Sequence, residues 1–576
     1  MAITKVTGSL LGNYTVGTSN VVVGNTAGDS LQSGGIDNTV VGDEAGTAIT
    51  TGRFNTLIGK AAGDALNDAD SNVAIGRGAL SSDTQGSQST AIGTLALTAQ
   101  NFTSATDAYN VAVGAEAGKA VTTGTDNTII GGLAGDASTT GAGNTFIGKE
   151  AGTSNTTGGD NVAVGKGSLK TNTTASNNIA IGKDALELNT TGAANVAIGN
   201  FALDSNTTAN DNVAIGHDAL QANTTGALNT AVGTSALGAN TTADSNNAFG
   251  RRALYTNTTG AQNTALGYLS LYLNTTASYN TSVGVSSMQS NTTGAKNTSV
   301  GYGALTSNTT GTENVVVGEV ALDSNTTGSY NTAIGRHSLS SATTASNNTA
   351  VGRNAMGDNT TGAGNTALGK DAGAAITTGA NNICIGIDCG DTTTTGDTNI
   401  LIGNTARASA SGGANQISMG VVVTCVGDNN FTFGNQGTDS NIAFGATSIT
   451  APSDIRLKED IQDEEVGLNF INDLRPVTFL WKKEKDIPSH FDSYKEGSEE
   501  RTMNGKHNHG FIAQEVKATI DAHNLKDGFE MWQENESDGR QRVAPAALMS
   551  VMVKAVQELS TQVDELKQEL IALKGE

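Results

Sequence analysis

The sequence predicts a mainly β protein: a parallel β-solenoid, or β-roll, of 24 repeats, followed by a small α+β domain that ends in a long helix. Three observations lead to this prediction. A motif recurs every 17 residues through most of the chain, all prolines and tryptophans lie after residue 450, and residues 552–573 carry apolar side chains at heptad spacing. We therefore divide the chain into an N-terminal segment (1–19), the repeats (20–450), a folded domain (451–545) and a C-terminal helix (546–576).

Each repeat is marked by a glycine that closes a short apolar segment, such as "NVAIG" at 195–199. From Gly114 to Gly420 this marker glycine recurs every 17 residues, and five further copies lie upstream. A fixed period of this length indicates stacked units, because one unit cannot bury its own apolar face. The three residues before the glycine alternate between β-branched and small side chains, which is typical of a short strand with two different faces.

The rest of the repeat contains a row of asparagines, a corner and a turn. Asparagine stands four residues before the marker glycine in 22 of the 24 copies, with Ser89 and Gln416 as the exceptions. A buried amide requires a partner, so we predict a ladder in which each amide bonds to the next one along the solenoid. The glycine predicts a corner with positive φ. The leucine four residues later predicts a second apolar anchor, and "NTTG" predicts a tight turn.

Composition and charge exclude several classes of function. The net charge is −23 and no long basic run is present, which argues against nucleic acid as a partner. No run of 18 apolar residues and no secretory signal pattern occur, so we expect neither membrane insertion nor secretion through a signal peptide. No histidine accompanies Cys384, Cys389 and Cys425, so we expect no metal and no cofactor.

Several tyrosines interrupt the repeat and are candidates for contact with a receptor. Tyr255 and Tyr272 follow successive marker glycines by five residues, so they should stack on neighbouring coils. Tyr268 and Tyr302 directly follow their glycines. An exposed tyrosine offers a sugar an apolar ring and a hydroxyl. Packing between coils is the alternative role for these rings.

The repeats resemble the head repeats of trimeric adhesins, the "NSVAIG" type that builds a left-handed parallel β-roll. The closest matches are "NVAIG" at 195–199 and at 212–216. This resemblance implies a homotrimer of rolls that pack through their alanine-rich face. Phage fibres carry similar repeats. Interwinding of three chains, with one strand from each at every level, is the alternative to one coil per repeat.

The last part of the chain carries four motifs in order: "SDIRLKEDI" at 453–461, "LRPVTFLWK" at 474–482, "GFIAQEV" at 510–516 and "KAVQEL" at 554–559. Together they resemble the C-terminal intramolecular chaperone domain of phage tailspikes, tail fibres and endosialidases. The resemblance implies a domain that trimerises the chain, guides folding of the fibre before it and then cuts itself off. It places the cut between Pro452 and Ser453.

The catalytic dyad that the resemblance implies is Ser453 with Lys458. A serine hydroxyl needs a base to take its proton, and lysine serves as that base only when desolvation lowers its pKa. A proline before the cut departs from the usual family pattern, and we expect it to slow cleavage. The segment "VAPAAL" at 543–548 stands where the family usually has an aromatic residue, which puts the packing around Pro545 in question. Four further residues of the motifs are supporting candidates: Asp454, His509, Gln514 and Glu515.

The C-terminal helix is expected to form a trimeric coiled coil. Its apolar residues alternate spacings of four and three, which is the pattern of a heptad seam. Up to residue 556 the helix could instead pack on its own domain, but no chain remains to cover the later residues. The seam consists of Met552, Val556, Leu559, Val563, Leu566, Leu570 and Leu573.

We interpret the chain as a structural, receptor-binding homotrimeric tail fibre of a phage or of a phage-derived injection system. It would be made in the host cytoplasm, reside in the virion, join a tail or baseplate component and bind a host cell-surface glycan or protein. Its enzymatic activity would be at most one round of autoproteolysis, with none on external substrates. The alternative is a bacterial trimeric surface adhesin with the same repeats, which the missing signal peptide and membrane anchor disfavour.

Overall fold

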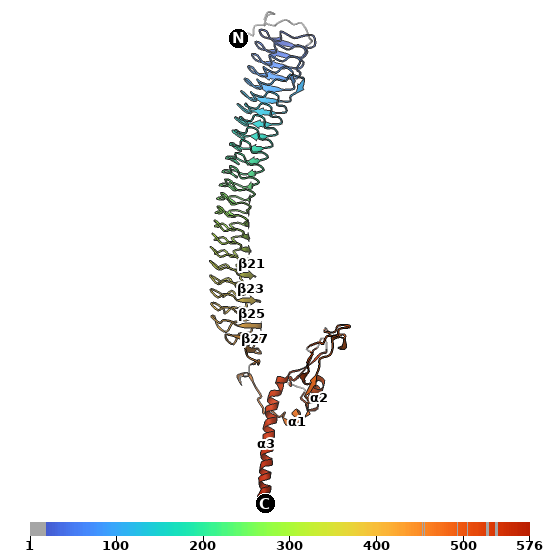
Figure 1. Ribbon diagram of the computed structural model, residues 1–576. Helices are drawn as coiled ribbons and strands as arrows, with labels where there is room; N and C mark the ends of the chain where they lie inside the picture. Colours follow the sequence, from blue (N-terminus) through green and yellow to red (C-terminus); the bar gives the residue numbers. More distant parts are fainter. Residues whose placement is uncertain are drawn as a thin grey trace. The chain divides into compact units, whose positions relative to one another are not determined.

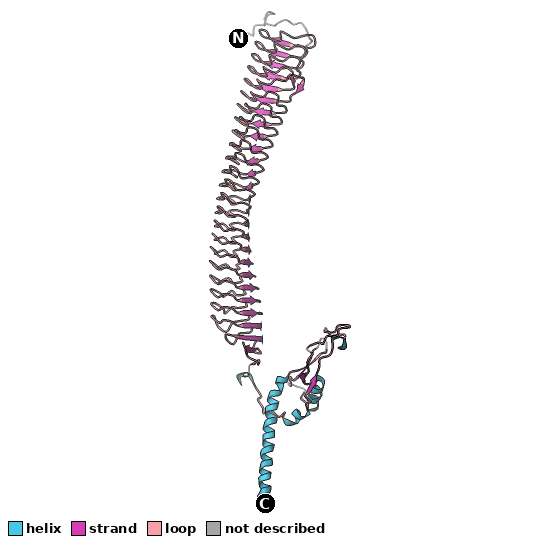
Figure 2. Ribbon diagram, viewed as in Figure 1, coloured by secondary structure: helices cyan, strands magenta, loops and turns pink. Residues whose placement is uncertain are grey.

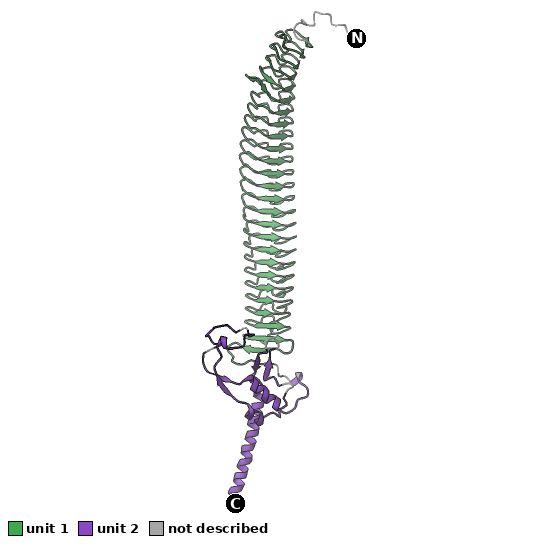
Figure 3. Cartoon of the chain, turned by 90° about the vertical axis from the view of Figure 1, so that its right-hand side faces the viewer, with its two compact units in different colours: residues 1–452 green, residues 453–576 purple. Residues whose placement is uncertain are grey.

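The computed structural model describes residues 19–451, 453, 455–491, 493–503, 505–525, 529–535 and 539–575. The chain forms two compact units, residues 1–452 and residues 453–576 (Figure 3).

The first unit is a solenoid with one short strand in each coil and turns on the remaining sides (Figures 1 and 2). Strand β13 (Val196–Ile198) pairs in parallel with β14 (Val213–Ile215), and each residue meets its counterpart 17 positions later. Each strand thus finds its neighbours within its own chain. The predicted parallel β-solenoid with one coil per repeat is confirmed.

The main sheet of this unit has 26 strands. Its members are β1 (Val21–Val23), β2 (Thr39–Val41), β3 (Thr56–Ile58), β4 (Val73–Ile75), β6 (Thr90–Ile92), β8 (Val111–Val113), β9 (Thr128–Ile130), β10 (Thr145–Ile147), β11 (Val162–Val164), β12 (Ile179–Ile181), β13, β14, β15 (Thr230–Val232), β16 (Asn247–Phe249), β17 (Thr264–Leu266), β18 (Thr281–Val283), β19 (Thr298–Val300), β20 (Val315–Val317), β21 (Thr332–Ile334), β22 (Thr349–Val351), β23 (Thr366–Leu368), β24 (Ile383–Ile385), β25 (Ile400–Ile402), β26 (Ile417–Val421), β27 (Asn430–Asn435) and β28 (Ser440–Ala443).

The two faces of each strand point into and out of the coil. The middle residue is alanine in most copies and is fully buried inside the coil, as Ala197 is. The residue before the marker glycine faces outward and is 38% exposed at Ile215 and 49% exposed at Leu368. The expectation that rolls would pack through the alanine-rich face is therefore wrong. A coil of 17 residues encloses little volume, which favours a small side chain inside, and only some coils hold a large one there, such as Phe146.

The marker glycine forms the corner after the strand, as predicted. Gly216 has φ +137°, and a Cβ placed on it would lie 2.7 Å from the carbonyl oxygen of Gly233 on the next coil. No other residue fits both the conformation and the close approach of two backbones. The predicted second anchor is also present, since Leu203 and Leu220 are fully buried in the core of the coils.

The predicted asparagine ladder runs through the interior of the solenoid. The backbone N–H and the side-chain Nδ2 of Asn229 both donate to Oδ1 of Asn212, at 2.9 and 3.2 Å. The asparagine of "NTTG" forms a second ladder that the sequence interpretation treated only as a turn. Asn240 Nδ2 donates to Asn223 Oδ1 at 2.9 Å and to the carbonyl oxygen of Ala243 at 3.0 Å. These amides are fully buried, so both ladders satisfy polar groups that water cannot reach.

The regular stack changes at two places. Four extra residues before Gly114 allow a small parallel pair outside the main sheet, between β5 (Gly86–Ser87) and β7 (Thr106–Asp107). At the far end, β27 pairs in parallel with β26 but antiparallel with β28. The antiparallel hairpin closes the sheet after the last repeat.

The second unit is a small α+β domain whose strands form two antiparallel pairs, β29 with β30 and β31 with β32. Its apolar core consists of Phe470, Leu474, Val516, Ile520, Met531, Leu548 and Val551. Its elements are η1 (Ile455–Leu457), α1 (Leu468–Asp473), β29 (Val477–Phe479), η2 (Glu484–Asp486), β30 (Asn508–Gly510), α2 (Ala513–Ala522), β31 (Trp532–Glu534), β32 (Gln541–Val543), η3 (Pro545–Ala547) and α3 (Leu548–Lys574).

Helix α3 starts on this core and then runs beyond it. Leu548, Val551 and Ala555 are buried against the domain. The seven residues of the predicted seam are all exposed in the single chain, by 63% at Leu566 for example. A heptad row that is exposed in one chain is typical of a helix that packs against copies of itself.

Candidate functional site

Ser453 and Lys458 lie on either side of the single helical turn η1, at the start of the second unit. The turn closes where the Lys458 backbone N–H donates to the carbonyl oxygen of Ile455 at 3.2 Å. Lys458 Nζ donates to Ser453 Oγ at 2.8 Å. A dyad needs this proximity, because the base must be within hydrogen-bond reach of the proton that it removes.

The surroundings of the two side chains are open in the single chain, where both are exposed. A lysine removes a proton only in its neutral form, which desolvation favours. The single chain therefore brings the dyad together without providing the dry environment that the chemistry requires. Pro452, on the other side of the expected cut, and Asp454, a supporting candidate, lie outside the described residues.

Glu515, at the start of α2, has a structural partner. Arg475 Nε donates to Glu515 Oε2 at 2.9 Å, and Arg475 Nη2 also contacts Glu515 Oε1. The hydrogen bond from Arg475 lowers the pKa of the Glu515 carboxyl and keeps it ionised. This ion pair joins the "LRPVTFLWK" and "GFIAQEV" motifs.

His509 and Gln514 are exposed, on β30 and α2 respectively. Within the described part of the chain, neither Ser453 nor Lys458 hydrogen-bonds to His509, Gln514 or Glu515. The structure thus brings Ser453 and Lys458 together and gives Glu515 a different partner, Arg475.

The "LRPVTFLWK" motif, the start of the "GFIAQEV" motif and Pro545 meet at a shallow depression on the second unit. Pro545 lies in it, so the segment that differs from the family pattern still packs beside the other motifs. The residues that line the depression are Pro476, Val477, Thr478, His509, Gly510, Phe511 and Pro545.

The dyad and the Arg475–Glu515 ion pair lie in the region that matches a known protein family. Residues 453–525 match the family described as chaperone of endosialidase. This chaperone match begins at Ser453, the first residue of the second unit, and includes Lys458, Arg475 and Glu515. The C-terminal unit thus contains an intramolecular chaperone domain, in agreement with the resemblance of its motifs. No curated protein and no solved structure matches the chain.

The tyrosine candidates lie on the solenoid as the period predicts. Tyr255 and Tyr272 stack across neighbouring coils, with ring centroids 5.7 Å apart and planes inclined by 9°. Both are half-buried, whereas Tyr268 is 43% and Tyr302 is 64% exposed. The rings of the first pair therefore contact each other across the coils, and the other two rings are the more exposed.

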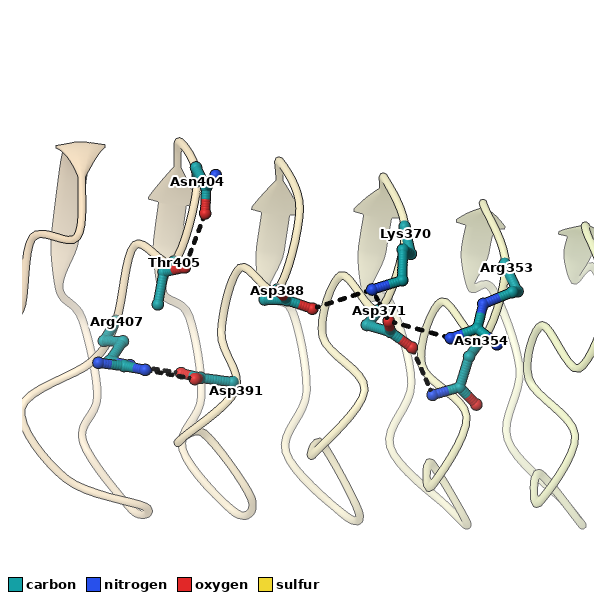
Figure 4. A network of polar contacts seen from close by, with 9 residues as sticks. All are labelled: Arg353, Asn354, Lys370, Asp371, Asp388, Asp391, Asn404, Thr405 and Arg407. Atoms are coloured by element: carbon teal, nitrogen blue, oxygen red, sulfur yellow. Dashed lines mark hydrogen bonds and ion pairs between the residues drawn. The ribbon is translucent and has the colours of Figure 1, made fainter.

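Charged side chains of the solenoid pair with each other across the coils. Lys370 Nζ lies 2.9 Å from Asp371 and 3.9 Å from Asp388 on the following coil (Figure 4). In the same view, Arg407 donates two hydrogen bonds of 2.7 Å to Asp391. Exposed pairs of this kind stabilise a protein little, but each one neutralises a cation of the acidic solenoid.

The described residues lack two kinds of feature. They contain no group of three or more His, Cys, Asp or Glu side chains placed to hold a metal ion. None of their helices combines the length and the apolar character needed to cross a bilayer.

Proposed function

We propose that this chain is a homotrimeric tail fibre of a phage or phage-derived particle, whose C-terminal chaperone domain trimerises the chain, guides its folding and then removes itself before Ser453. The observation that carries the proposal is the contact between Lys458 and Ser453, made at the residue where the second unit and the chaperone match both begin. The match also favours a fibre over a bacterial surface adhesin. The solenoid would be the part that remains after the cut.

The cleavage needs only groups of the chain and one water molecule. Neutral Lys458 takes the proton of the Ser453 hydroxyl, and Oγ attacks the carbonyl carbon of Pro452. The bond to the Ser453 nitrogen breaks, an ester forms, and the nitrogen takes up a proton as the new N-terminal amine. Water then hydrolyses the ester and leaves a carboxylate on Pro452.

Assembly into a trimer would supply the desolvation that the exposed dyad lacks. In the single chain, two apolar surfaces stay uncovered: the seam of α3 and the row of outward strand residues, such as Ile181 and Ile215. Burial of both surfaces among three chains removes apolar area from water and brings three copies of the junction together. Cleavage would then follow assembly, because only the trimer would shield Lys458 from water.

The order of events has a kinetic reason. Similar repeats can pair out of step, so a long solenoid has no strong register of its own between chains. A trimeric domain at one end sets that register before the repeats close. Its later removal leaves the fibre kinetically trapped in the assembled state. In the proposed role, the exposed side of the coils would then bind the host surface.

Comparison of the intact chain with three single variants tests the proposal. The wild-type protein should yield two fragments on a denaturing gel, and the mass of the smaller one should equal that of residues 453–576. Ser453→Ala and Lys458→Ala should remain full length, because one lacks the nucleophile and the other lacks the base. Ser448→Ala, an exposed serine just before the junction, is the matched control and should be cut normally.

Oligomeric state separates a loss of chemistry from a loss of folding. Ser453→Ala should have the mass of a trimer by light scattering, since nucleophile and seam are separate features. Equal cleavage in wild type and Ser453→Ala would show that another protease makes the cut. A monomeric wild-type protein would contradict the trimeric fibre itself.

A further inference from the structure

A basic and aromatic surface covers two neighbouring coils in the middle of the solenoid. The guanidinium carbon of Arg251 lies 5.7 Å from the ring centre of Tyr268, and that of Arg252 lies 5.8 Å from the ring centre of Tyr255. Tyr255 in turn stacks on Tyr272. Tyr268 and Tyr272 lie one repeat after Arg251 and Tyr255, so the five side chains lie on two neighbouring coils, and we call them the Arg–Tyr surface.

The two arginines differ from most cations of the solenoid, which pair with carboxylates as Lys370 and Arg407 do. Over the described residues, Arg251 and Arg252 have no carboxylate within ion-pair distance, and both are exposed. Two adjacent guanidinium groups in a chain of net charge −23 therefore keep their charge available to an external anion. Stacking on tyrosine holds each group in place without occupying its N–H donors.

The chemistry of these groups specifies the ligand. A guanidinium group binds a carboxylate through two parallel hydrogen bonds. A tyrosine ring packs against the apolar face of a sugar, and its hydroxyl bonds to the sugar's polar edge. A saccharide with carboxylate groups satisfies both kinds of group at once. Single-stranded nucleic acid also combines anions with stacking rings, but it requires a groove lined by many cations, which an acidic solenoid does not provide.

We propose that the Arg–Tyr surface binds a carboxylated glycan, an inference that rests on the proposed role of the fibre in host attachment. The surface lies after the marker glycine, in rows of mostly polar residues, and not in the apolar strand row that we assign to contact between chains. It therefore stays accessible in a trimer. Three copies in one trimer would bind a repetitive polysaccharide with increased avidity.

Binding of the cleaved fibre to immobilised galacturonate and glucuronate oligosaccharides tests this inference, with the neutral galactose and glucose oligosaccharides as counterparts. Wild type should bind the charged sugars and not the neutral ones. Arg251→Gln and Arg252→Gln should each weaken binding by about tenfold or more, through loss of charge-assisted hydrogen bonds. Arg77→Gln is the matched control, because Arg77 also directly follows a marker glycine, is exposed and has no tyrosine stacked on it among the described residues.

Three results would overturn the inference: no binding to either uronate, equal binding to neutral sugars, or equal losses in Arg77→Gln and Arg251→Gln. Preference for a single-stranded oligonucleotide over the uronates would also overturn it. Cleavage and trimer mass are measured on the same preparations. A fibre that cuts itself and trimerises but ignores the uronates contradicts only the Arg–Tyr surface, whereas an uncut monomer contradicts the proposed function.

Discussion

Replacement of one ladder asparagine should measure how much the interior hydrogen bonds stabilise the solenoid. Asn229 lies near the middle of the stack and is fully buried. In Asn229→Ala, the backbone N–H of Asn246 loses its acceptor, which is Asn229 Oδ1 at 2.9 Å. The carbonyl oxygen of Ala243 loses one of its two donors but keeps Asn240 Nδ2 at 3.0 Å. The change therefore leaves one buried N–H without a partner.

One orphaned buried N–H costs about 1–3 kcal/mol per chain. Such a defect opens the coils around it, because each repeat is stabilised only by its neighbours. Backbone amides of the coils next to Asn229 should then exchange with solvent about 5- to 150-fold faster. This factor is the loss of about 1–3 kcal/mol converted into the equilibrium constant for local opening. If the whole solenoid of roughly 430 residues melts as one unit, the melting temperature should fall by only about 1–3 °C.

Hydrogen exchange followed by mass spectrometry is therefore the more sensitive assay. The matched control is Asn200→Ala, since the Asn200 side chain is exposed and its Oδ1 accepts one hydrogen bond, from the Lys183 backbone N–H at 3.0 Å. Water replaces that acceptor, so exchange near Asn200 should hardly change. Equal exchange rates in the two variants would refute the conclusion that the buried ladder stabilises the stack.

Two further predictions concern the solenoid. Desolvation raises the pKa of Asp204 to about 6, and the nearby carboxylates of Glu187, Asp184 and Asp218 contribute less to this shift. The folded state therefore binds the Asp204 proton more tightly than the unfolded chain does. Stability from this group is greatest in acid and falls as pH rises from about 4 to about 6. Asp204→Asn should thus melt above wild type at pH 7.5 and close to it at pH 4, and equal melting at pH 7.5 would contradict this assignment. Ile215→Asp should weaken the trimer in light scattering, because it removes about 1 kcal/mol of apolar burial per chain and places a carboxylate at the interface. Leu188→Asp, 44% exposed outside the strand row, should leave the trimer intact, and equal trimer loss in both variants would exclude the strand row as the interface.

The sequence alone was sufficient for the features that a single repeat specifies locally. A glycine at the corner, an apolar residue before it and, in nearly every copy, an asparagine directly before the strand recur in one register, so parallel pairing and the ladder followed from the period. The dyad was also accessible, because Ser453 and Lys458 belong to a recognisable motif and are only five residues apart. A short turn between residues this close keeps the two side chains within reach of each other.

Tertiary structure decided what depends on distant parts of the chain. Strand alternation shows that two faces differ but not which one closes inward, and the alanine face was therefore assigned to the wrong side. The second ladder stayed hidden because a turn sequence does not reveal whether its asparagine is buried. The free charge of Arg251 and Arg252 depends on which carboxylates the neighbouring coils place beside them. Burial and charge pairing depend on all the residues that surround a side chain in space. Those residues are distant in the sequence, and only the closed coil brings them together.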